Sequence, residues 1–454
     1  MIDIPLDGLP PERRRWAVLT LMLAVGMASL DTSIANTALP TIATDLLASP
    51  VASVWVINAY QLALVVSLLP FASLGEIYGY RRVYLWGLVV FTGASIACSL
   101  SWSLESLTAA RVLQGFGASG IMSVNTALVR FIYPARALGK GVGINALTVG
   151  VSTALGPTVA AAILSVASWQ WLFAVNGPVG VLALLLAARA LPETPRAARA
   201  FDGASAALNA ATFGLLIFGI GEAAHQVVPW VTASVLAGAA LFGVALVRRQ
   251  LAMAAPMLPV DLYRRPIFAL SSLTSFCSFA AQGLAFVSLP FYFQSSLGRS
   301  AVETGLLLTA WPVLTAALAP VAGPLSDRYP AAILGGIGMV VLCAGLVLMA
   351  TIGPAPTDAA CVWRLMLCGA GFGFFQSPNL KAIMSSAPPE RSGGASGIIA
   401  TSRLCGQSVG AALVALCFGL SMQSGPTWAL GLAAGFAGVA SLVSFSRLLP
   451  RYAA

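Results

Sequence analysis

The sequence predicts an all-α membrane protein of about 14 transmembrane helices, with two six-helix halves and two extra helices between them. Three observations support this prediction. Of the 454 residues, 58% are hydrophobic and 9% are charged, whereas a soluble domain carries about 25% charged residues. Apolar runs recur along the whole chain, and most approach the ~20 residues that cross a bilayer as a helix. Patterns in the first half also recur weakly in the second half.

The first apolar run follows Arg13–Arg15 and is too long for a signal peptide, and it lacks a small-residue cleavage site. We therefore interpret it as the first membrane helix. Short connections, several with Gly or Pro, separate the later runs, and the pairs around 83–128 and 141–190 are almost continuous. Hydropathy places the spans near residues 16–38, 51–71, 83–101, 105–128, 141–165, 170–190, 204–222, 229–248, 266–290, 301–322, 331–352, 359–380, 394–419 and 426–447.

Lys and Arg residues lie in loops on one predicted side of the membrane, and the opposite loops hold only Arg299. The positive-inside rule then places both termini in the cytoplasm. We expect an integral protein of the bacterial cytoplasmic (inner) membrane, in contact with lipid. The net charge of +9 is spread over many short loops instead of one patch, so we expect no nucleic-acid partner.

One acidic residue, Asp31, is predicted to lie well inside the hydrocarbon, because the others fall in loops or at span ends. A carboxylate there costs at least ~2.5–3.5 kcal/mol, so such residues usually face a protein interior or a wet cavity and mark an ion or substrate path. A structural acid that only fixes helix packing is the alternative. When the basic residues are sorted by position in the same way, three arginines fall within predicted spans: Arg111, Arg364 and Arg403.

An internal repeat relates the two ends of the chain. Arg111 precedes GFGASGIMSVN, and Arg364 precedes the similar GAGFGFFQSPN. The loop ASLGEIYGYRR (72–82) has a partner in GPLSDRY (323–329). We therefore expect an N-terminal bundle at 1–200, two linker helices at 201–262 and a C-terminal bundle at 263–454. Parallel halves with a midplane site between them suit alternating access.

These patterns resemble the major facilitator superfamily, specifically its fourteen-span drug:proton antiporters, over nearly the whole chain. LDTSIANTALP (30–40) looks like the first-helix motif, whose acid is generally implicated in proton or cation handling. The loop at 72–82 resembles G-x-L-x-D-R-x-G-R-R, with Ala72, Glu76 and Ile77 as departures. Arg111, with Gln114 and the following glycine, matches the fourth-helix motif L-x-x-x-R-x-x-Q-G.

Two further stretches match the exporters of this branch. Gly143, Gly156 and Pro157 match the antiporter motif of the fifth helix, although small residues replace three of its glycines. Such residues allow close helix approach and bending. WQWLFAVNGPVG (169–180) looks like the signature of the fourteen-span branch, and R-x-x-G-x-x-x-G from Arg403 also fits it. The resemblance points to exporters of methyl viologen and quaternary ammonium compounds.

An ammonium-bearing drug and a proton can compete for one buried carboxylate, because burial and a nearby cation act oppositely on its proton affinity. At ~1.5 Å per residue, Asp31 lies roughly 13 Å from Pro40 and Arg111 roughly 12 Å from Ser103, so the two share a depth. In the family fold their helices are neighbours. We therefore expect Arg111 to pair with Asp31 or to bond its surroundings; a static ion pair is the alternative.

The remaining candidates form two groups. Charged inner loops are predicted to hold one access state through bonds to helix ends, and otherwise only set topology; this gating group is Glu76, Gly79, Arg81, Arg82, Gly323, Asp327 and Arg328. Polar and aromatic residues are predicted to line a cavity that accepts flat lipophilic cations, with helix packing as the alternative role; this group is Asn58, Tyr60, Gln61, Asn145, Phe279, Gln282, Phe286, Arg364, Gln376 and Arg403.

The sequence thus favours a proton-driven exporter of lipophilic, cationic small molecules that acts as a monomer. It is expected to need no cofactor and no metal, since the proton gradient drives it and the seven cysteines form no C-x-x-C pair. Export of an anionic or zwitterionic metabolite remains open, because the predicted spans contain three arginines and only one aspartate. A membrane enzyme lacks support, since no His/Asp/Cys cluster or nucleotide loop is present. A non-transporting receptor would not need a carboxylate inside the membrane.

Overall fold

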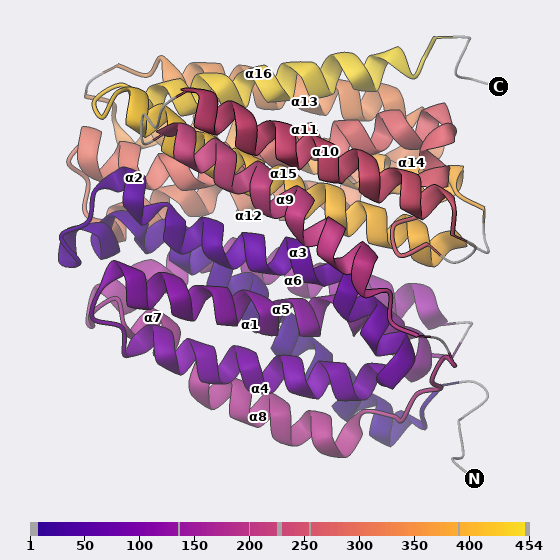
Figure 1. Ribbon diagram of the computed structural model, residues 1–454. Coiled ribbons are helices and arrows are strands. Elements are labelled where there is room, and N and C mark those ends of the chain that lie inside the picture. Colours follow the sequence, from indigo (N-terminus) through magenta and orange to yellow (C-terminus); the bar gives the residue numbers. More distant parts are fainter. Residues whose placement is uncertain are drawn as a thin grey trace. The chain divides into compact units, whose positions relative to one another are not determined.

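The computed structural model describes residues 8–134, 137–198, 200–224, 229–253, 256–353, 355–388 and 391–449. Within these ranges the chain is helical and contains no strand (Figure 1), so the predicted all-α class is confirmed. In this described part of the chain, fourteen spans are long and apolar enough to cross a membrane. The elements are α1 (Pro11–Asp45), α2 (Pro50–Ser53), α3 (Trp55–Tyr78), α4 (Tyr80–Ser99), α5 (Leu104–Ile132), α6 (Leu138–Leu164), α7 (Trp171–Ala174), α8 (Asn176–Ala190), α9 (Gly203–Ala224), α10 (Pro229–Leu251), η2 (Val260–Arg264), α11 (Pro266–Phe291), η3 (Tyr292–Ser296), α12 (Ala301–Arg328), α13 (Ala331–Ala350), α14 (Asp358–Ser386), α15 (Ser392–Leu420) and α16 (Gly425–Ser446).

Several helices run past the predicted spans. Helix α1 extends over 35 residues, whereas the apolar run covers 16–38, and α12 ends at Arg328 instead of near 322. Hydropathy detects only the apolar part of a helix, and the helical hydrogen bonds continue into the polar segment beyond it. Two predicted spans are each divided into a short and a long helix, α2 with α3 and α7 with α8.

Local sequence determines where many helices begin. The Ser300 hydroxyl accepts the Glu303 N–H of α12 at 3.2 Å, while the Glu303 carboxylate accepts the Ser300 N–H at 2.8 Å. Ser103 forms the corresponding capping box with Ser106 at the start of α5. Such caps satisfy backbone donors that the first helical turn leaves unpaired. Gly79 separates α3 from α4 with φ of +97°, a conformation that favours glycine.

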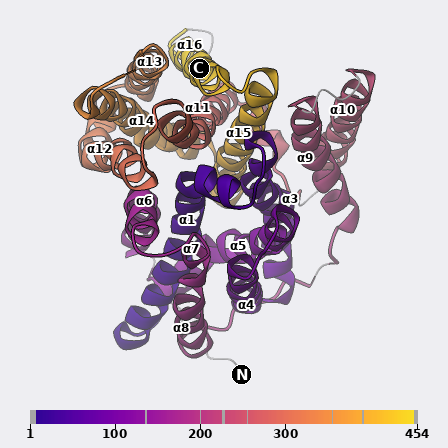
Figure 2. The same cartoon turned by 90° about the vertical axis from the view of Figure 1, so that its left-hand side faces the viewer.

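The chain forms two compact units. Unit 1 contains residues 1–35 and 55–210, and unit 2 contains residues 36–54 and 211–454. In unit 1, α5 packs against α3 and α4, and Gly117 permits close contact with the backbone of Phe91. In unit 2, α13 packs against α14 and α16, and Figure 2 shows α13 beside both helices. Helix α11 packs against α15 and α16.

Helices α9 and α10 correspond to the two predicted linker helices. They pack on each other where Gly219 and Gly238 of the two helices lie against Leu236 and Leu215. At the start of α9, Asn209 donates a hydrogen bond to the Val66 carbonyl of α3 at 2.9 Å. Otherwise the pair is largely exposed: only 11% of the most apolar segment of α10 is buried. Such an apolar exposed face is what a helix in contact with lipid presents.

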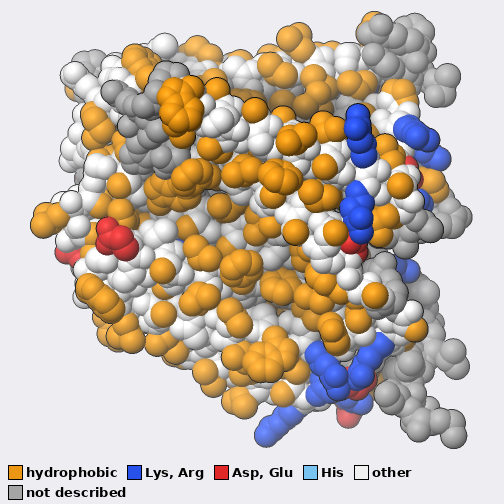
Figure 3. All heavy atoms as spheres, viewed as in Figure 1, with side chains coloured by type: hydrophobic (Ala, Val, Ile, Leu, Met, Phe, Trp, Pro, Cys, Tyr) orange, Lys and Arg blue, Asp and Glu red, His pale blue; other side chains and the backbone are white. Residues whose placement is uncertain are grey.

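The outer surface has the distribution expected of a membrane protein. Hydrophobic side chains cover most of the face shown in Figure 3, and Lys and Arg gather near helix ends. Exposed large apolar residues include Trp86 at 70% and Leu442 at 72%. In water such a surface would drive association, so lipid is its natural solvent.

Candidate functional site: a carboxylate buried in unit 1

Asp31 lies in the middle of α1 with only 1% of the residue exposed. Its carboxylate accepts hydrogen bonds from side chains of α5 and α8, all within unit 1. The sequence predicted either a protein interior or a wet cavity around this acid, and the structure places it in the interior of the bundle. An isolated carboxylate in such surroundings would be strongly disfavoured, so its partners decide what it can do.

Arg111 of α5 supplies the positive charge. It is 0% exposed, and its Nη1 donates to Asp31 Oδ2 at 2.5 Å. The same nitrogen contacts Gln114 Oε1 at 2.5 Å, and Nε donates to the Val56 carbonyl at 3.1 Å. The ring of Tyr60 lies under the guanidinium, with 4.2 Å between its centroid and Cζ. Arg111 is therefore fixed by a carboxylate, an amide, a backbone carbonyl and an aromatic face.

Two side-chain amides complete the shell of the carboxylate. Gln114 Nε2 and Asn176 Nδ2 both donate to Asp31 Oδ1 at 2.8 Å. Gln114 Nε2 also donates to the Ser95 hydroxyl of α4 at 2.8 Å. Each of these partners of Asp31 is thus a donor, as the acceptor oxygens of a carboxylate require. Asn176 begins α8, and its neighbour Phe173 in α7 places a second ring 5.6 Å from the guanidinium.

The predicted antiporter motif lies on α6 and contacts α1 two residues beyond the acid. Pro157 has no N–H and therefore leaves the carbonyl of residue 153 without its usual helical donor. The Ser33 hydroxyl donates to this Thr153 carbonyl at 3.0 Å. Gly156 makes the approach possible, because a Cβ there would lie 2.2 Å from Ser33 Oγ. Gly143, by contrast, is exposed and has no atom within 4 Å of an added Cβ.

The other predicted cavity residues of unit 1 do not all join the acid cluster. Tyr60 does, through its contact with Arg111. Asn58 and Gln61 are buried on the same helix, α3. Asn145 of α6 is half-buried and accepts a hydrogen bond from Asn125 of α5 at 2.7 Å.

In unit 2 the predicted aromatic residues make ring contacts. Phe279 lies edge-on to Phe372, with centroids 5.4 Å apart, and Phe286 lies edge-on to Trp311 at 5.1 Å. Between them on α11, Gln282 accepts a hydrogen bond from Gln407 of α15 at 3.1 Å. Phe279 and Gln282 are buried, Phe286 is half-buried, and Gln376 on α14 is exposed.

The two arginines within the spans of unit 2 differ from Arg111. Arg364 donates to the carbonyls of Leu348 and Ala360, at 3.1 and 2.8 Å. Because Leu348 lies in the last turn of α13, Arg364 satisfies a carbonyl that the helix end leaves unpaired. Arg403 of α15 is half-buried and has no hydrogen-bond or ion-pair partner among the described residues.

The predicted gating residues make charged contacts with partners that sequence did not name. Arg81 pairs with Glu193, beyond α8, and also donates to a carbonyl in the last turn of α8. Asp327 of α12 pairs with Lys381 of α14. In the same group, Gly79 forms the turn before α4, Glu76 is half-buried, Arg82 and Arg328 are exposed, and Gly323 has open space around it.

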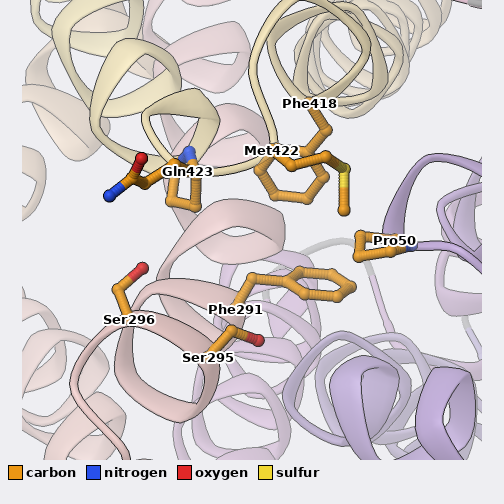
Figure 4. Close-up of a pocket in the computed structure, with 8 residues that line it drawn as sticks. Pro50, Phe291, Ser295, Ser296, Phe418, Met422 and Gln423 are labelled. Carbon is orange, nitrogen blue, oxygen red and sulfur yellow. The ribbon is translucent and has the colours of Figure 1, made fainter.

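A cavity of about 340 Å³ lies within unit 2, and none of the candidate residues above lines it (Figure 4). It is lined by Pro50, Phe291, Ser295, Ser296, Phe418, Met422, Gln423 and Pro426. Phe291 lies edge-on to Phe418, with ring centroids 5.1 Å apart. No charged residue lines the cavity, so it offers nothing that could exchange a proton.

Sequence reasoning did not assign roles to Gln114, Asn176, Ser95 or Ser33. Gln114 and Asn176 were noticed only as parts of family patterns. The spacing of Gln114, three residues after Arg111, puts both on one helix face and could have identified it. Asn176 contacts the acid from α8, and Ser95 of α4 contacts Gln114; no spacing within a single sequence reveals contacts between helices.

The fold and this site together define a polytopic helical membrane protein with one charge pair buried inside a bundle. The chain matches the model of the Major Facilitator Superfamily over residues 21–271 and 271–453. It therefore belongs to the Major Facilitator Superfamily, and it is a transporter rather than an enzyme.

Three relatives illustrate the range of this family. The uncharacterized transporter YebQ of Escherichia coli is 54% identical over 99% of this chain and 98% of its own. The riboflavin transporter RibZ of Clostridioides difficile is 29% identical over 90% of each chain. The multidrug resistance protein Stp of Mycobacterium tuberculosis is 32% identical over 88% of this chain and 75% of its own.

Proposed function

We propose that this transporter is a proton-coupled antiporter that exports lipophilic, cationic drug-like compounds from the cytoplasm by alternating access. Asp31 is the group that exchanges the proton. The observation that carries the proposal is the Asp31 cluster: a carboxylate in the middle of a membrane-capable helix, 1% exposed and held by donors of two neighbouring helices. The multidrug resistance protein among its relatives supports a drug-like cargo.

The geometry also suggests how proton and cargo are coupled. Asp31 Oδ2 is occupied by Arg111, and Oδ1 accepts two amide donors. A cationic cargo could reach this carboxylate only by displacing Arg111. We therefore propose that protonation neutralises the charge with which Arg111 pairs, and that cargo acts on the bundle around the pair instead of binding Asp31, so the two ligands compete through conformation.

The test is transport by inverted membrane vesicles that carry the wild type or Asp31→Asn. With ethidium as the probe, the wild type should accumulate dye when a pH gradient is imposed, and dye addition should dissipate that gradient. Asp31→Asn should do neither. Glu105→Gln, which neutralises an exposed acid in the first turn of α5, is the matched control. Full coupled transport by Asp31→Asn would refute the proposal.

A second candidate function is export of an anionic or zwitterionic metabolite, and Arg403 favours it. A cation within a membrane helix is costly unless it is paired or faces a polar path, and this one has no acidic partner among the described residues. In the same vesicles, fluorescein and ethidium are anionic and cationic probes of similar size. If Arg403 binds anionic cargo, Arg403→Gln should abolish fluorescein transport and spare ethidium transport. Unchanged fluorescein transport would exclude this candidate.

A further inference from the structure

Protonation of Asp31 has a geometric requirement that follows from its hydrogen bonds. Both carboxylate oxygens face donors: Arg111 on Oδ2, and the amides of Gln114 and Asn176 on Oδ1. A protonated carboxyl group becomes a donor itself and needs an acceptor. In their present orientation the three donors offer the protonated group no acceptor, so a neighbour that can turn an acceptor atom toward Asp31 would stabilise the protonated state.

Arg111 and Gln114 are poorly placed to move. Arg111 Nε is held by the Val56 carbonyl, and its guanidinium lies on the Tyr60 ring. The Gln114 amide is held on both sides: its nitrogen donates to Ser95, and its oxygen accepts from Arg111. If the Gln114 amide rotated, its NH₂ group would face the guanidinium, and two donors would oppose each other.

Asn176 is different. Its side chain makes a single hydrogen bond within the described part of the chain, the one to Asp31 Oδ1 at 2.8 Å. Rotation of its terminal amide by half a turn replaces the NH₂ donor with a carbonyl acceptor at the same place. The Asn176 amide can thus serve both protonation states of the acid, whereas a guanidinium can serve only the ionised state.

The other groups that face Asp31 are few. Among the described residues, Arg111 of α5 is the one charged group in contact with it, and Tyr60 of α3 and Cys98 of α4 are the neighbouring titratable groups. Cys98 Sγ is 3.6 Å from Gln114 Oε1. Helix α8 contributes Asn176, which does not titrate, so an effect of substituting it acts through Asp31.

We propose that Asn176 is a positioning residue for proton exchange: its amide turns from donor to acceptor as Asp31 takes up its proton, and it thereby sets the pH range in which the acid exchanges. This inference rests on the proposed role of Asp31. Removal of the amide should destabilise the ionised form of Asp31 more than the protonated form, because a hydrogen bond to a charged acceptor is roughly twice as strong as one to a neutral acceptor.

Infrared difference spectroscopy of the purified protein over a pH series tests the inference without a transport assay. The probe is the C=O band of a protonated carboxyl group that is absent from Asp31→Asn. In Asn176→Leu the midpoint of this band should move to higher pH by about one unit. In the wild type, a side-chain amide band of Asn176 should change over the same pH range as the carboxyl band, and this amide change should be absent from Asn176→Leu. Asn176→Gln should restore much of the wild-type behaviour.

The matched control is Asn209→Leu, since Asn209 is an equally buried amide in unit 1 that donates to a backbone carbonyl. This control should leave the midpoint unchanged. If Asn176→Leu does not fold, Asn176→Ser gives the same test, and its midpoint should also move upward. A midpoint that is unchanged in the Asn176 variants overturns this inference alone. A wild type with no Asp31 band between about pH 4 and 10 overturns the proposed proton role itself, because the ion pair would then be static.

Discussion

At the scale of single residues, the buried pair of Asp31 and Arg111 is the most consequential feature of unit 1. Two ionised groups leave water completely when this bundle forms, and their mutual contact must offset that desolvation. The extra hydrogen bonds from Gln114, Asn176 and the Val56 carbonyl explain how the pair is tolerated. The pair is therefore sensitive to the loss of either partner.

The first prediction is that Arg111→Leu lowers the free energy of unfolding by about 3–5 kcal/mol, because it leaves a buried carboxylate unpaired. The double variant with Asp31→Asn should recover a large part of this loss, since no buried charge remains. Unfolding in mixed detergent micelles, followed by circular dichroism, measures both. If the single and double variants are equally unstable, the carboxylate is not the source of the loss.

Part of this site was predictable from sequence. Asp31 and Arg111 stand out because charged residues inside apolar runs are rare, and helix rise alone put them at one depth. Asn176 and Ser95 do not stand out, since an amide or a hydroxyl within a span costs little and occurs often. Their roles depend on which helices are neighbours, and that information comes only from the fold.

At the scale of secondary-structure elements, the contact between α1 and the bend of α6 links the acid-bearing helix to the antiporter motif. Pro157 frees the Thr153 carbonyl, and Ser33 satisfies it from the neighbouring helix. The close packing at Gly156 adds a steric constraint at the same place. The contact with α6 thus lies only two residues after Asp31 in the chain.

The second prediction concerns this hydrogen bond. Ser33→Ala should destabilise the protein by about 1–3 kcal/mol, because a buried carbonyl loses its donor. In a Pro157→Ala background, residue 157 has an N–H for the Thr153 carbonyl, so Ser33→Ala should there cost much less. The difference between the two costs is the coupling measured by a double-mutant cycle. Equal costs in both backgrounds would show that Ser33 does not serve the carbonyl freed by the proline.

The third prediction compares two glycines of the same motif. Gly156→Ala forces a Cβ against Ser33 and should cost about 1–3 kcal/mol through overpacking. Gly143→Ala meets no atom within 4 Å and should be neutral or slightly stabilising in a helix. Thermal unfolding of the two variants in the same detergent makes the comparison. A Gly143→Ala variant as unstable as Gly156→Ala would contradict the packing described for α6.

At the scale of the whole molecule, hydropathy predicted all fourteen membrane-capable helices, because lipid requires long apolar helices and leaves few alternatives. It did not predict the breaks at α2 and α7 or the ends of α1 and α12, since these depend on caps and loops rather than on hydrophobicity. The arrangement of the repeats as two equivalent halves, with α9 and α10 between them, remains a proposal.

The fourth prediction tests the proposed orientation in the membrane. Met422, before α16, and Tyr329, before α13, are 57% and 55% exposed. In intact cells a membrane-impermeant maleimide should label Met422→Cys and should label Tyr329→Cys only after permeabilisation. The native cysteines give low background, since six of the seven are buried. The reverse labelling pattern would place the termini outside the cytoplasm.

The end of the chain contains one more feature with a mechanical consequence. Arg447, just after α16, is 6% exposed and donates to Ser271 of α11 and Asn379 of α14, at 2.8 and 3.0 Å, and also to Ser444 of its own helix. Three helices are thus fastened at one end by a single buried guanidinium. Helices joined in this way resist sliding along one another, so we expect this group of helices to tilt as one rigid block during the transport cycle.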